Sequence, residues 1–154
     1  MRESGENEQG KTKITEVKTF PVPFVPNEIK ENISISLNTP SQSPKEKIIS
    51  QAFKFHSQGN ISEAKKYYQQ LIHQGCNDHR VFSNYGVILK SLGKLQEAEV
   101  LTRKAIEFNP DFDNAHYNLG NILSSLGKLQ EAELSTRKAI ELNPNFAEAH
   151  SNLG

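Results

Sequence analysis

The stretch GKLQEAE at residues 93–99 recurs unchanged at residues 127–133, 34 residues later. The block TRKAIE recurs with the same offset, at 102–107 and again at 136–141. Self-similarity at a fixed period of roughly 20–50 residues is typical of repeat architectures, in which each unit stacks on its neighbours. The sequence therefore predicts an array of 34-residue units.

Two further copies extend the array in both directions. A diverged copy, GNISEA, lies at 59–64, and the beginning of another, AEAHSNLG, lies at 147–154. The array is expected to cover residues 44–154, in units at 45–78, 79–112 and 113–146 and a partial unit at 147–154.

Each unit has the apolar spacing of two short antiparallel helices. In the third unit, four positions mark one face of a first helix: His116, Leu119, Gly120 and Leu123. Gly127 can end that helix at positive φ, and Pro144 stops the second helix. The small residues that would let paired helices approach closely are Gly86, Gly120, Ala98 and Ala132. The sequence therefore predicts an all-α fold, an α-solenoid of antiparallel helix pairs.

The array begins at a specific start signal. Ser43 can cap a helix, Pro44 is suited to its first position, and Glu46 completes a capping box. Helices are expected at 44–57, 62–74, 79–91, 96–108, 113–125, 130–142 and 147–153.

Residues 1–43 have no helical period. The segment FPVPFVP at 20–26 favours extended backbone, and the remainder is polar. Such a segment cannot bury enough apolar area to offset its ordering entropy. We predict a disordered leader over 1–43, acting as a linker or tail; a short recognition motif is the alternative.

Composition excludes several classes of partner. The 18 acidic residues balance the 18 basic ones, so no net field favours nucleic acid or an anionic membrane. No stretch approaches the roughly 18 consecutive apolar residues that span a bilayer, and Met1 is not followed by a secretory signal. Cys76 is the only cysteine, which excludes an internal disulfide. The composition predicts a cytoplasmic protein without nucleic-acid or membrane partners.

No group of residues suggests catalysis. His116 and His150 lie one repeat apart, but they occupy a position that is expected to pack between helices and have no third ligand nearby. The pair Glu97 and Glu99, like its repeat at 131 and 133, lies among lysines and arginines and indicates a solvated face. We therefore expect a protein that is not an enzyme, with no catalytic residue, metal or cofactor.

The 34-residue helix-turn-helix period, with small, Gly, Ala and Pro positions in this order, resembles the tetratricopeptide repeat (TPR) family over residues 44–154. The phrases NLGN at 118–121 and RKAIELNP at 137–144 are most similar to arrays attached to O-linked N-acetylglucosamine transferases. The chain departs from the family in three places. Phe82, His116 and His150 replace a tryptophan, Thr102 and Thr136 replace an aromatic residue, and the first unit lacks its terminal proline.

One polar residue recurs on the first helices opposite their apolar face, at Asn84, Asn118 and Asn152. Asparagine inside a helix costs about 0.5 kcal/mol relative to alanine, so three in register indicate a function. The resemblance implies that first helices line a concave groove and that asparagines at this position hold peptide backbone. The alternative is that duplication copied a tolerated residue. The other peptide-binding candidates on this face are Asn114, Asn121 and Arg80.

The sequence thus predicts a scaffold that binds an extended peptide segment of a protein partner. Arg80 alone does not make the basic clamp with which other members of the family hold a C-terminal carboxylate. The alternative is a substrate-recruiting N-terminal arm of a longer glycosyltransferase or sulfotransferase, because the sequence stops at Gly154 inside an expected first helix.

Overall fold

The computed structural model describes residues 41–154, so nearly all of the predicted leader at 1–43 lies outside the described residues. Within the described part every regular element is an α-helix, and the chain runs through them in this order: α3 (Pro44–Ser57), α4 (Ile61–His73), α5 (His79–Ser91), α6 (Leu95–Phe108), α7 (Asp113–Ser125), α8 (Leu129–Leu142) and α9 (Ala147–Leu153). Each helix begins and ends within one residue of its predicted bounds. The predicted all-α fold is confirmed.

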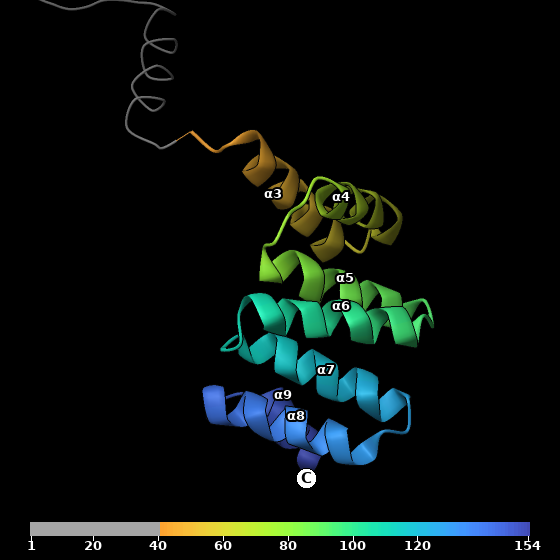
Figure 1. Cartoon of the computed structure of the whole chain (residues 1–154), viewed down its shortest axis with the longest axis vertical. Coiled ribbons are helices and arrows are strands. Elements are labelled where there is room, and N and C mark those ends of the chain that lie inside the picture. The colour runs from red at the N-terminus through yellow and green to blue at the C-terminus, as the bar shows by residue number, and fades with distance from the viewer. Residues whose placement is uncertain (1–40) are drawn as a thin grey trace, which may run out of the picture. The chain divides into compact units, whose positions relative to one another are not determined.

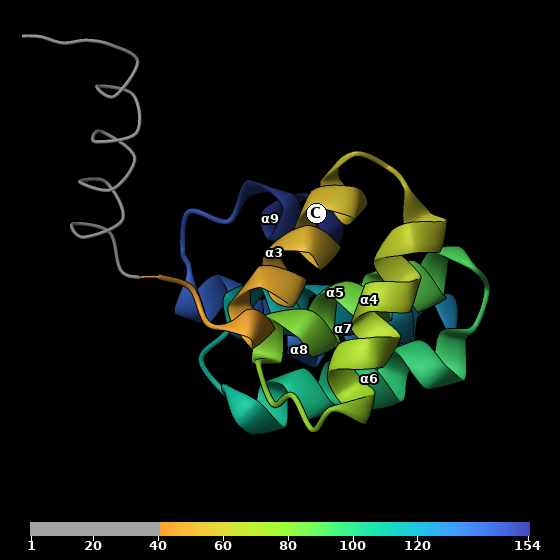
Figure 2. The same ribbon diagram turned by 90° about the horizontal axis from the view of Figure 1, so that it is seen from above.

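The helices are stacked in chain order along the long axis of the array, and each first helix packs against the second helix that follows it (Figure 1). Successive units then contact each other through α4 and α5, α6 and α7, and α8 and α9. The first helices α5 and α7 also touch directly. Seen from above, α4 and α6 overlie each other along the stack (Figure 2).

Local signals fix the helix ends. The Ser43 hydroxyl accepts a hydrogen bond from the Glu46 amide at 3.2 Å, which confirms the predicted N-cap. Asn60 Oδ1 caps α4 in the same way, accepting from the Glu63 amide at 3.3 Å. Gly127 follows α7 at a φ of 79°, the left-handed conformation that only glycine adopts without strain. The helix pairs are therefore delimited by residues that sequence reasoning could identify.

The two helices of a unit meet at a glycine. A Cβ atom added to Gly120 would lie 3.2 Å from the Ala132 carbonyl oxygen and would collide with Oγ1 of Thr136. Thr136 is buried, and its hydroxyl donates to the Ala132 carbonyl oxygen at 2.9 Å. Gly86 and Thr102 make the equivalent contact one unit earlier. Threonine, at the position where the family has an aromatic residue, is thus the side chain that packs directly against the glycine.

The two complete boundaries between units are packed differently. At the first boundary, the buried Tyr68 ring stacks on Tyr85 with centroids 5.9 Å apart and contacts Phe53 at 6.2 Å. At the second boundary, the buried residues are the aliphatic Ala115 and Ile122 of α7. The first boundary is therefore aromatic and the second aliphatic.

The predicted position of the two repeated histidines needs correction at His150. His116 Nε2 lies 2.8 Å from the Pro110 carbonyl oxygen, and His150 Nε2 lies 2.9 Å from that of Pro144. Both rings therefore hydrogen-bond the loop that precedes their own helix, and His116 is half-buried there as expected. His150 is exposed. The hydrogen bond to the loop, which apolar periodicity does not report, decides where each ring lies.

None of the helices in the described part of the chain is long and apolar enough to span a membrane.

The glycine contact predicts where a larger side chain is least tolerated. Ala98 is fully buried, whereas Ala132 is 7% exposed. Overpacking a core typically costs about 1–3 kcal/mol, so Ala98→Leu should lower the melting temperature most and Ala132→Leu less. Ser151→Ala, on the exposed α9, should leave it nearly unchanged. Melting followed by circular dichroism tests this order. Equal melting temperatures for all three variants would show that the packing face is misplaced.

A half-buried histidine, His56, predicts a dependence of stability on pH. His56 Nδ1 lies 3.2 Å from the Tyr68 hydroxyl, and burial lowers the pKa of His56. The folded protein therefore holds His56 neutral at a pH at which the unfolded chain, with a histidine pKa of about 6.5, already binds a proton. The stability contributed by neutral His56 is present above about pH 6.5 and is lost as the pH falls toward its folded-state pKa.

The measurement is urea unfolding at about pH 7.5 and about pH 5.5 for the wild type and for His56→Gln. The wild type should lose more unfolding free energy between the two pH values than the variant does. Equal losses would contradict the assignment to His56.

Candidate functional site

The three repeated asparagines lie on three successive first helices. Asn84 is on α5, Asn118 is on α7 and Asn152 is on α9. The first two are half-buried and the third is exposed. We call the side of the array formed by α3, α5, α7 and α9 the first-helix face.

Two of these asparagines donate to the preceding first helix. Asn118 Nδ2 donates to Ser83 Oγ on α5 at 3.0 Å. Asn152 Nδ2 donates to Asn121 Oδ1 on α7 at 2.5 Å. A primary amide has two N–H donors and an acceptor oxygen, so one such bond leaves further capacity for a ligand. The amides thus link adjacent units and keep hydrogen-bonding capacity for a peptide.

Asn84 makes the corresponding contact with the first unit. Its side chain lies near the hydroxyl of Tyr68 on α4 and acts on the pKa of that group. Burial raises the pKa of Tyr68 to about 12, and Asn84 acts in the opposite direction. Because the Tyr68 hydroxyl also lies 3.2 Å from His56 Nδ1, Asn84 belongs to a small polar network inside an aromatic boundary. Each repeated asparagine therefore contacts the unit before its own.

Two of the other predicted site residues lie at helix N-termini. The backbone N–H of Asn114 donates to Asp113 Oδ1 at 2.8 Å, and the side chain of Asn114 is exposed. Arg80 Nε and Nη2 both donate to the Asp78 carboxylate, at 3.0 and 2.5 Å, and the guanidinium lies 5.4 Å from the Phe53 ring centroid.

Asp78 neutralises the charge of Arg80. Burial by itself would raise the pKa of Asp78, but the hydrogen bonds and charge of Arg80 outweigh it and hold that pKa below its usual value. Arg80 is therefore already engaged by a carboxylate of its own chain.

Sequence reasoning missed two residues that lie beside the row of asparagines, Ser83 on α5 and Tyr68 on α4. Ser83 is only 1% exposed although it is polar, and it accepts the bond from Asn118. The positions 34 and 68 residues after Ser83 hold Tyr117 and Ser151, so the repeat alignment gives no consistent signal there. A buried serine beside Asn84 in an otherwise apolar run was the available hint. Among the described residues, no group of three or more His, Cys, Asp or Glu side chains could hold a metal ion.

Comparison with family models supports the repeat assignment. A model of the tetratricopeptide repeat matches residues 114–146, and a second model, described as TPR repeat, matches residues 86–127. No curated protein matches the chain.

Solved structures show the same fold in several proteins. The Thermobaculum terrenum O-GlcNAc transferase aligns with 73% of this chain at 23% identity and a TM-score of 0.68, but the chain spans only 22% of that protein. The first TPR domain of Spaghetti (RPAP3), bound to the HSP90 peptide SRMEEVD, aligns with 71% of this chain at 25% identity and a TM-score of 0.66, with 86% of that domain covered. MamA aligns with 78% of this chain at 19% identity and a TM-score of 0.65, with 67% of it covered.

The helix pairs, the 34-residue period and these comparisons agree: residues 86–146 match models of the tetratricopeptide repeat, and the described part of the chain has the fold of such an array.

Proposed function

We propose that the array is a protein-interaction scaffold and that its first-helix face binds an extended peptide segment. The observation that carries this proposal is the row of three amides on successive first helices, Asn84, Asn118 and Asn152. A primary amide pairs with a peptide group regardless of the side chain that the peptide carries. Binding through such a row depends on the backbone of the ligand more than on its sequence.

The spacing of the row suits an extended backbone. Packed helices lie about 8–10 Å apart, and three residues of extended peptide cover about 10 Å. Successive asparagines of the row can therefore contact ligand residues that are three positions apart. Each neutral hydrogen bond contributes only about 0.5–1.5 kcal/mol, so affinity should be modest and should grow with the number of amides engaged.

The contacts between units give the amides a second role. Asn118 is held by Ser83 and Asn152 by Asn121 before any ligand arrives. Side chains ordered in advance lose less conformational entropy on binding. The contacts to the preceding unit thus support peptide binding by fixing the amides on the face.

A peptide complex of a similar domain supports the proposal. The RPAP3 domain, which shares the fold and 25% of aligned residues with this chain, binds an HSP90 peptide. Since Arg80 of this chain is paired with Asp78, we do not extend the identity of that peptide to this protein. The location of the protein in the cytoplasm and the identity of its partner stay predictions.

The second candidate function is a substrate-recruiting arm of a longer glycosyltransferase or sulfotransferase. The likeness to the bacterial O-GlcNAc transferase, at 23% identity, carries the fold alone. Sequencing the coding region beyond codon 154 tests this alternative, which requires a catalytic domain downstream.

The peptide proposal predicts the effect of removing all three amides. A peptide is first selected from a displayed library on the full chain. The variant Asn84→Ala with Asn118→Ala and Asn152→Ala should bind it tens of fold more weakly, because three bonds of about 0.5–1.5 kcal/mol are lost. Titration calorimetry measures the affinity, and melting curves check the fold.

Ser83→Ala is the matched control, because it breaks the Ser83–Asn118 bond but leaves every amide of the row in place. It should reduce affinity far less than the triple variant does. Unchanged affinity in a folded triple variant would show that the row of asparagines is only a product of duplication.

A further inference from the structure

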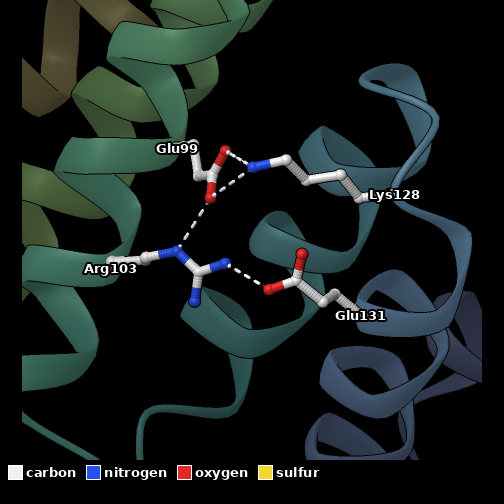
Figure 3. A network of polar contacts seen from close by, with 4 residues as sticks. All are labelled: Glu99, Arg103, Lys128 and Glu131. Carbon is white, nitrogen blue, oxygen red and sulfur yellow. Dashed lines mark hydrogen bonds and ion pairs between the residues drawn. The ribbon is translucent and has the colours of Figure 1, made fainter.

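Four charged side chains join the second and third units on the side opposite the first-helix face. Lys128 Nζ contacts the two oxygens of the Glu99 carboxylate at 3.2 and 2.9 Å (Figure 3). Arg103 donates from Nε to Glu99 at 2.9 Å and from Nη2 to Glu131 at 3.0 Å. Hydrogen bonds from Lys128 and Arg103 lower the pKa of Glu99, and its side chain is only 14% exposed. This network bridges α6 and the start of α8.

The first boundary has different residues at the same four positions. The residues 34 positions earlier are Lys65, Gln69, Lys94 and Glu97. Lys65 thus occupies the position equivalent to Glu99, and Lys94 the position equivalent to Lys128. The attractive pair of the second boundary is replaced by two lysines at the first. Lys94 instead pairs with Glu97 of its own helix at 2.9 Å. Among the ion pairs of the described residues, none joins α4 to α6.

An open groove lies at this first boundary. It has a volume of about 440 Å³, and its apolar lining comes from α4, α5 and α6. The side chains that form this lining are Ile72, Tyr85, Leu89, Val100 and Leu101. Val100 is 66% exposed although it is apolar. The polar part of the lining is Gln69, His73, Gln96 and Glu97, and the Glu97 carboxylate is paired with Lys94. The corresponding depression at the second boundary includes Arg103, Lys104 and Glu107. We call the groove at the first boundary the second-helix groove.

We propose that the second-helix groove is a binding site for an acidic amphipathic helix, separate from the peptide-binding first-helix face. Its volume is within the range of about 300–1,000 Å³ typical of ligand pockets. A helix that binds in a groove inserts large apolar side chains from one face, and the apolar lining of this groove suits them.

The positive charge of the first unit favours an occupant with acidic side chains. Lys65 has no ion pair among the described residues, and residues 45–78 contain five lysines against three acidic residues. Lys65 lies one helical turn before Gln69, which lines the groove. A carboxylate of the occupant would pair with Lys65 at this edge of the groove, as the Glu99 carboxylate pairs with Lys128 at the next boundary. The second boundary therefore supplies a template within the same molecule for the missing anion.

The test uses two synthetic helical peptides that share one leucine pattern and carry either glutamate or lysine at their solvent-facing positions. Binding to the full chain is followed by fluorescence anisotropy at low salt. The glutamate peptide should bind at least about fivefold more tightly than the lysine peptide, the upper range for one exposed charge pair. Equal binding, tighter binding of the lysine peptide, or no binding of either would overturn the proposal.

The decisive variant is Lys65→Glu with Gln69→Arg, which installs at the first boundary the residues that bridge the second. It should raise the melting temperature and abolish binding of the glutamate peptide. Val100→Glu is a second variant at an exposed position, and it should repel the same peptide without a loss of fold. If both folded variants keep the affinity of the wild type, the groove is not the site.

Two controls locate the effect. Glu133→Lys with Arg137→Gln makes the reverse exchange at the equivalent positions of α8, where both side chains are more than half exposed, and should leave binding unchanged. The triple asparagine variant should also bind the glutamate peptide normally. A loss of affinity in the triple variant would place the acidic helix on the first-helix face and reject the second-helix groove.

Discussion

The contact between a glycine on the first helix and a threonine on the second sets the geometry of each complete unit from the second onward. At Gly120 the two helices approach so closely that a single Cβ atom would collide with Thr136, and Gly86 and Thr102 repeat the arrangement. Each unit is therefore a thin, rigid pair, and most of its remaining apolar surface must be covered by its neighbours. The stacking of units follows from this constraint.

Differences between the boundaries follow from what each unit presents to the next. The first boundary is closed on one side by stacked tyrosines and stays open on the other, where Lys65 replaces an acid. The second boundary has an aliphatic core and a bridge of four charges around Glu99. A single exposed ion pair contributes little to stability. Glu99 is largely shielded from solvent and binds two cations, so this network constrains the spacing of α6 and α8 more than a single exposed pair would. The same fold thus produces one bridged and one open boundary.

The sequence predicted the helices closely because their signals are local. The start at Ser43, the turn at Gly127 and the apolar spacing of α7 each depend on residues within a few positions of one another. The contacts of the candidate site depend on residues 31 or 35 positions apart, such as Asn152 with Asn121 and Asn118 with Ser83. Repeat alignment shows which positions are equivalent but does not show which ones meet across a boundary. For that reason the row of asparagines was identified and its partners were missed.

The first boundary places the two proposed binding sites close to each other through one aromatic pair. Tyr85 lines the second-helix groove, and its ring stacks on Tyr68. The hydroxyl of Tyr68 lies near Asn84, whose side chain acts to lower the pKa of that hydroxyl. A ligand that moved Tyr85 would therefore act on the position of Asn84 through two rings in direct contact. The equivalent of Tyr85 one unit later is Leu119, and that of Tyr68 is Thr102, so the second boundary has no such pair. This aromatic pair is thus confined to the boundary at which the ionic bridge is missing.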